Sequence, residues 1–150
     1  MEVKNARCLV KSLVPWSVGF KRINSIGDVT LPAFGKIYLD AEEIISQCYN
    51  NNKLFVGPNG NGDHASLYVE DDTLRKEVGF ETDDKKQDIL SDEKLRKLFD
   101  YKQMETFKRH LVSAIVTQAE RFKIVEYIKK NKVNDYNKIK VVEEVTGIAI

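Results

Sequence analysis

The 150-residue sequence is poor in the residues that build disulfide frameworks and metal sites. It contains two cysteines, Cys8 and Cys48, without CxxC spacing, and two histidines, His64 and His110, in different segments. This pattern favours two buried, reduced thiols over a disulfide or a reactive site. Two histidines without clustered acids do not form a metal site. The sequence therefore predicts neither a bound metal nor a cofactor.

Long apolar runs are also missing. No stretch approaches the roughly 18 apolar residues of a membrane-spanning helix, and the polar residues 1–7 lack the features of a signal peptide. We therefore expect a protein that is made in the cytoplasm and does not engage a membrane. The 24 basic and 23 acidic residues nearly balance. Residues 101–150 alone carry 10 basic against 6 acidic residues, which is weaker than the basic stripe of most duplex binders.

Catalytic constellations are equally sparse. No serine lies in a nucleophile elbow, and no cysteine and histidine share a segment with an orienting third group. Neighbouring acids such as Glu42 and Glu43 are typical of a solvated surface. An enzyme would need a pocket that gathers His64 and Asp63, which nothing in the sequence indicates. We therefore predict a protein that is not an enzyme.

The first 72 residues read as a small β domain. Strands are predicted at 6–14, 18–23, 29–31, 36–39, 53–56 and 64–70, the last two as a hairpin. A short helix over 40–49 interrupts them, and Asp40 followed by Glu43 resembles an acidic capping box. This pattern predicts a small barrel or sheet with one inserted helix.

The loop over residues 57–64 is rich in glycine and asparagine. It lacks the lysine and the following helix of a phosphate-binding loop. Asn59, Asn61, Asp63 and Glu70 alternate as calcium ligands do, but His64 stands where a calcium loop needs glycine. A hairpin loop is the main interpretation, with a weak cation site and a partner-contacting loop as alternatives.

The remaining residues predict an acidic connector over 73–90 and a helical hairpin over 91–150. Apolar residues recur every three or four positions from Ser91 to Asn131, as in one long amphipathic helix that is about 60 Å long at 1.5 Å per residue. Such a helix either breaks near its middle or reaches toward a partner. A final helix is expected after Asn134 or Asp135 and before Gly147. The predicted fold class is α+β.

Residues 27–56 carry a family resemblance. They read Gly-x-Val-x-Leu, then Gly-Lys-Ile-Tyr-Leu-Asp-Ala-Glu-Glu-Ile-Ile, then Asn-Lys-Leu-Phe-Val. This order resembles small bacteriophage head and tail accessory proteins, in which a short barrel carries a strand, an acidic-capped helix and another strand. The resemblance implies an assembly role in the virion without catalysis, and it transfers no functional residue.

The leading functional prediction is therefore a structural or interaction protein, capsid-associated in a bacteriophage, that docks on neighbouring protein subunits as a homo- or hetero-oligomer. Aromatic residues are favoured at interfaces, although each of them also suits a core. The predicted partner-binding residues are Trp16, Phe34, Asn59, Asn61, Phe107, Phe122, Tyr127 and Tyr136.

The alternative prediction is a nucleic-acid-binding accessory protein that uses a basic C-terminal face. Residues 121–150 resemble the opening of a helix-turn-helix, but the sequence stops where a recognition helix would begin. The lysines of that face are Lys123, Lys129, Lys130, Lys132, Lys138 and Lys140.

Overall fold

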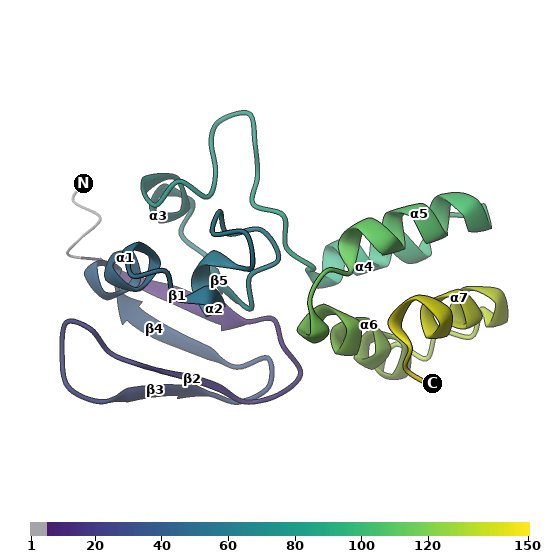
Figure 1. The fold of residues 1–150 in the computed structure, drawn as a ribbon, viewed down its shortest axis with the longest axis horizontal. Coiled ribbons are helices and arrows are strands. Elements are labelled where there is room, and N and C mark those ends of the chain that lie inside the picture. The colour runs from purple at the N-terminus through teal and green to yellow at the C-terminus, as the bar shows by residue number, and fades with distance from the viewer. Residues whose placement is uncertain (1–5) are drawn as a thin grey trace. The chain divides into compact units, whose positions relative to one another are not determined.

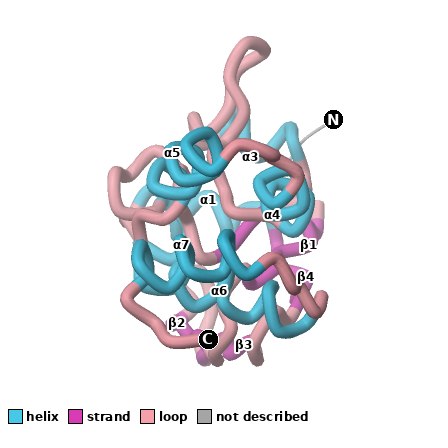
Figure 2. The backbone as a smooth tube through the Cα atoms, turned by 90° about the vertical axis from the view of Figure 1, so that its right-hand side faces the viewer, coloured by secondary structure: helices cyan, strands magenta, loops and turns pink. Residues whose placement is uncertain are grey.

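The computed structural model describes residues 6–150, and the chain divides into two units, one that ends at Ile89 and one that begins at Leu90. The strands lie in the first unit, and the last four helices of the chain form the second (Figures 1 and 2). The fold class is α+β, with strands before helices, as the sequence predicts. Each unit has its own hydrophobic core.

The first unit is built on a three-stranded antiparallel sheet in the order β4-β1-β5. Its strands are β1 (Arg7–Ser12), β4 (Lys36–Asp40) and β5 (Leu67–Val69). Alternate residues of β1 point to opposite faces, so Cys8 and Val10 face the core whereas Leu9 and Lys11 lie on the outer face. The sheet therefore has one buried face and one outer face.

A second, two-stranded sheet and one helix cover the buried side. β2 (Val18–Lys21) and β3 (Asp28–Leu31) form an antiparallel hairpin. Helix α1 (Ala41–Tyr49) contributes Ile44 and Ile45 to the same core. The ring of Phe20 meets that of Phe55 edge-on, with centroids 5.3 Å apart. Val29 and Leu31 of β3 share the core with Val10 of β1, so the two sheets pack through their side chains.

The predicted strand at 53–56 is wrong, because these residues form the short helix α2 (Lys53–Val56). The side chain of Asn52 accepts a hydrogen bond from the backbone N–H of Leu54, which caps the turn. The predicted hairpin with residues 64–70 is therefore wrong too. Only β5 of that segment is a strand, and it pairs with β1.

Residues 73–89, expected as a connector, belong to the first unit. They include most of α3 (Asp72–Glu77), and the side chain of Phe80 is buried in the first core. The buried guanidinium of Arg75 lies 3.0 Å from the carboxylate of Glu81 and donates to the carbonyl of Val69. This ion pair fixes the segment that follows α3.

The second unit contains four helices rather than a hairpin. They are α4 (Asp92–Phe99), α5 (Met104–Ala114), α6 (Gln118–Lys130) and α7 (Tyr136–Thr146). The long helix expected over 91–131 is broken, which is one of the two alternatives that its length left open, and it breaks twice, after Phe99 and after Ala114. Thr117 and Glu120 form a capping box that starts α6, with each side chain bonded to the other residue's backbone.

The other helix ends of this unit follow the sequence. Ser91 caps α4 through the N–H of Lys94, and Asp135 caps α7 through the N–H of Lys138. Gly147 ends α7 with a left-handed φ of 73°, as predicted. No helix within residues 6–150 has the length and apolar character needed to span a membrane.

Candidate functional site

Two of the predicted partner-binding residues lie on loops that the fold brings together. Trp16 follows β1 and is 40% exposed, and Phe34 lies between β3 and β4 and is 45% exposed. The N–H of Phe34 donates to the carbonyl of Val14 at 3.0 Å. We call residues 14–17 and 32–35 the aromatic turn. Its two large aromatic side chains are of types that dominate binding energy at interfaces.

The backbone at Phe34 is held in an unfavourable conformation. Phe34 has φ 55°, a left-handed value that is a genuine outlier for a bulky residue. The N–H of Gly35 donates to the carbonyl of Pro32 at 2.8 Å and closes a four-residue turn with Phe34 at its third position. Such turns usually place glycine or asparagine there. Strain of this kind clusters at functional sites, where it fixes a side chain in one orientation.

Gly35 is required by the same turn. A Cβ at this position would lie 2.7 Å from the ring of Pro32 and 2.9 Å from its carbonyl oxygen. Residues 32–35 are therefore locked by sterics as well as by hydrogen bonds. The aromatic side chain of Phe34 is presented on a rigid support.

The aromatic turn is next to the β1–β4 pair along the chain, because its residues follow β1 and precede β4. On the outer face of this pair Lys36 lies opposite Lys11, and Tyr38 lies opposite Leu9 in the adjacent row. Tyr38 is 58% exposed, and Leu9 is half-buried. Lys11 forms an ion pair with Glu70 at 2.5 Å. Among residues 6–150 we find no acid within ion-pair distance of Lys36.

A second exposed loop, between β2 and β3, is held by a buried carboxylate. Glu43 accepts hydrogen bonds from the backbone N–H groups of Ile23 and Asn24 at 3.0–3.1 Å and from the side chain of Gln47 at 2.9 Å. Burial acts to raise the pKa of Glu43, but these bonds and the charge of Arg22 hold it below its usual value. Glu43 therefore clamps the loop on α1, and it is not part of a capping box because Asp40 makes no side-chain cap.

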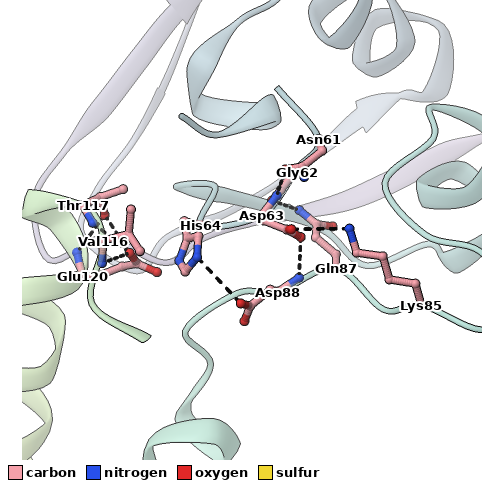
Figure 3. A network of polar contacts seen from close by, with 10 residues as sticks. All are labelled: Asn61, Gly62, Asp63, His64, Lys85, Gln87, Asp88, Val116, Thr117 and Glu120. Carbon is pink, nitrogen blue, oxygen red and sulfur yellow. Dashed lines mark hydrogen bonds and ion pairs between the residues drawn. The ribbon is translucent and has the colours of Figure 1, made fainter. Parts of the chain in front are cut away.

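The glycine-rich loop is closed on the segment before Ile89 (Figure 3). Asp63 accepts from the N–H of Asp88, the N–H of His64 donates to the carbonyl of Asp88, and Gln87 donates to the carbonyl of Gly62. Asn61 accepts from the N–H of Asp63. The loop is therefore fixed, and it is not the tip of a hairpin.

This loop does not assemble the calcium-like set. The carboxylate of Asp63 bonds to the Asp88 backbone and lies 3.5 Å from Lys85, whereas Glu70 pairs with Lys11 on β1. Among the described residues no three His, Cys, Asp or Glu side chains gather as metal ligands. Asn59 and Asn61 are exposed.

Each histidine contacts a side chain of its own unit, and both cysteines are buried. The imidazole of His64 lies 3.7 Å from the carboxylate of Asp88, and that of His110 stacks on Tyr101. Cys8 and Cys48 are buried free thiols, as expected. Burial raises the pKa of Cys48 to about 12, which makes its thiolate rare at neutral pH.

Of the four partner-binding residues predicted in the second unit, two are exposed and two are not. Phe107 is fully buried, so its assignment to an interface is wrong, and Tyr127 stacks on Phe99. Phe122 and Tyr136 are exposed. Phe122 lies on α6 outside its buried face, which carries Ile124 and Ile128.

Two of the six lysines of the predicted basic face are buried. Lys123 donates to the carbonyl of Leu90, and Lys138 donates to that of Phe99. These carbonyls lie just before and at the end of α4, so the two lysines hold both ends of that helix. Burial lowers the pKa of Lys123 to about 8, although nearby Asp92 and Glu120 oppose the shift.

The other four lysines, Lys129, Lys130, Lys132 and Lys140, are exposed. With Arg121 they give the outward side of α6 and the start of α7 a positive charge, diluted by Glu126 and by Glu143, which pairs with Lys140 at 3.7 Å. The basic face is therefore smaller than the sequence predicts.

Comparison with family models, curated proteins and solved structures finds no match for this chain.

Proposed function

We propose that this protein is a non-enzymatic interaction protein that docks on neighbouring protein subunits through its aromatic turn. The observation that carries this proposal is Phe34, an exposed aromatic side chain held on a left-handed backbone. A glycine there would relieve the strain and would expose less apolar surface. A function for the side chain would explain why phenylalanine occupies this position.

The rigidity of the turn supports the same proposal. The hydrogen bonds from Phe34 to Val14 and from Gly35 to Pro32 order the two loops before any partner arrives. A preordered surface loses less conformational entropy on binding than a mobile one. Trp16 adds a second large aromatic side chain, on the loop to which the backbone of Phe34 is bonded.

A role in a bacteriophage virion is the narrower form of this proposal. The resemblance over residues 27–56 supports it through β3, β4 and α1, which follow the order of strand and acidic helix. The third element of that pattern departs from it, because residues 53–56 are helical. The interaction role rests on the aromatic turn and does not depend on the virion assignment.

Sedimentation and matched variants test the interaction role. The native mass is measured for the wild type, for a Trp16→Ala, Phe34→Gly double variant and for Ile26→Ser, which removes a fully exposed side chain outside the turn. Tagged forms of the three proteins are also compared for the proteins that they retain from the native source. We expect the double variant to lose an assembly or a partner that the other two keep. Identical behaviour of all three would refute the proposal.

A second candidate function, nucleic-acid binding by the second unit, is favoured by its charge. Residues 90–150 carry 13 basic against 9 acidic residues, and Lys129, Lys130 and Lys132 lie exposed at the end of α6. Binding of this kind weakens steeply with salt. Reversing these three charges should abolish retention of a single-stranded oligonucleotide, and retention that is unaffected by salt or by the reversal would exclude this function.

A further inference from the structure

The outer face of the β1–β4 pair is organised in rows that alternate in chemistry. Leu9 and Tyr38 form an apolar row, and the next outward row toward the aromatic turn holds Lys11 and Lys36. The strands then end, and Ser12 donates to the carbonyl of Gly35 where the turn begins. Rows on one face of a strand are about 7 Å apart, because they are two residues apart.

The cationic row contains two positive charges and no acid, unlike the other charged row of this face. Like charges directly opposite each other destabilise a strand pair. Arg7 and Asp40, opposite each other at the far end, form an ion pair at 3.6 Å. Lys11 is neutralised by Glu70. Within residues 6–150 Lys36 has no such acid, so one positive charge stays available between two apolar features.

Resting on the function proposed above, we infer that the partner presents an extended peptide segment with a carboxylate between two apolar side chains. One apolar side chain lies against Leu9 and Tyr38, and the carboxylate meets Lys36. The other apolar side chain meets Trp16 and Phe34. An extended peptide places alternate side chains on one face at the same spacing of about 7 Å, so these three side chains are at positions i, i+2 and i+4.

An unbiased library of displayed linear peptides tests this pattern. Selection uses the full chain, with the Phe34→Gly variant as the counter-target. We expect enriched peptides to carry aspartate or glutamate with an apolar residue two positions to each side. Enrichment of peptides with a basic or uncharged central residue would overturn the inference.

Titration of one enriched peptide then measures each contact. Trp16 is the sole tryptophan of the sequence, so its emission reports binding at the turn. We expect Lys36→Gln to weaken binding about twofold to fivefold, as for an exposed ion pair. We expect Phe34→Gly to weaken it about 30-fold, as for an interface anchor. Ile26→Ser is the control and should leave affinity unchanged.

The two proposals fail in different ways. Binding that needs Phe34 but is indifferent to Lys36→Gln, and to replacement of the peptide carboxylate by its amide, refutes the carboxylate pattern and leaves docking by the aromatic turn intact. If no peptide is enriched over the Phe34→Gly counter-target, the peptide inference is refuted, and the sedimentation comparison decides the docking role separately.

Discussion

Comparing the stability of a Phe34→Gly variant with that of a Phe34→Ala variant tests whether the backbone at Phe34 is strained. A strained backbone makes the glycine variant the more stable of the two, and a relaxed backbone makes the alanine variant the more stable. Both substitutions remove the aromatic ring, so the difference between the two variants isolates the backbone. With φ at 55°, we expect the glycine variant to be the more stable of the two. This order reverses the usual one, because alanine restricts the unfolded chain more than glycine does.

The magnitude follows from two opposing terms. A left-handed backbone costs an L-residue about 1–2 kcal/mol, which glycine avoids. The greater freedom of glycine in the unfolded chain costs about 0.4–1 kcal/mol relative to alanine. The glycine variant should therefore unfold with a free energy about 0.5–1 kcal/mol larger than the alanine variant.

Urea unfolding followed by Trp16 emission measures this difference in the first unit, where the tryptophan lies. A difference of 1 kcal/mol corresponds to about 4–8 °C in Tm for a domain of 60–100 residues. Ala33→Gly is the matched control, because Ala33 has no positive φ, and it should destabilise by about 0.5–1 kcal/mol. An alanine variant of Phe34 that equals or exceeds the glycine variant in stability would refute the strain and, with it, the main support for the aromatic turn.

Three further substitutions test other parts of the fold. Glu43→Gln should cost about 2–3 kcal/mol at pH 7, because a charged acceptor of backbone N–H groups is lost. Since the pKa of Glu43 is lowered on folding, this stability is present above the ordinary glutamate pKa and is lost as pH falls through the folded pKa; a gap in urea midpoints that persists at pH 2 would contradict it. Gly57→Ala should destabilise by more than 2 kcal/mol, because the new Cβ would lie 2.2 Å from the carbonyl oxygen of Asp63, and thermal melts that match the wild type would show the loop to be looser than described. Folding lowers the pKa of Lys123 to about 8, so the unfolded chain binds this proton more tightly than the folded one. As pH rises from about 8 toward the ordinary lysine pKa, the free energy of unfolding of the wild type should therefore increase by up to about 3 kcal/mol relative to that of Lys123→Met. Equal dependence of the two proteins on pH in circular dichroism melts would disprove this.

The pattern of β formers predicted strands that overlap all five observed ones, together with a false strand at 53–56. The capping pattern at residues 40–43 marked the start of the first helix, and both signals are local. Residues 53–56 show the limit of such signals. Lys-Leu-Phe-Val is typical of a strand, yet the cap at Asn52 and the glycine at position 57 make one helical turn of it. A short apolar run does not distinguish strand from helix by periodicity alone.

The breaks between α4, α5 and α6 had a visible signal at only one place. Thr117 and Glu120 have the spacing of a capping box, which marks a helix start inside an apolar pattern that otherwise continues. The break after Phe99 has no glycine or proline, and the Phe99 carbonyl at this break accepts a hydrogen bond from Lys138, a residue 39 positions later. Such long-range contacts cannot be read from a local pattern.

The sequence predicted only part of the candidate site, and the rest was missed for similar reasons. Exposed aromatic residues in loops were recognised at Trp16 and Phe34, but no rule predicts a left-handed phenylalanine. Lys123 was assigned to a surface because lysines are rarely buried. In the structure it lies beside Ile124 on the buried face of α6.

The burial of Lys123 and Lys138 makes it possible to measure how often helix α4 detaches from the second unit. Acetic anhydride and similar amine-directed reagents modify lysines that solvent reaches, so the exposed Lys129 and Lys130 should be labelled within the folded protein. Lys123 and Lys138 are covered and bonded to backbone carbonyls, and they should stay unmodified until α4 detaches. The acetylated fraction of these two side chains, read by mass spectrometry, therefore counts the molecules in which this helix has opened.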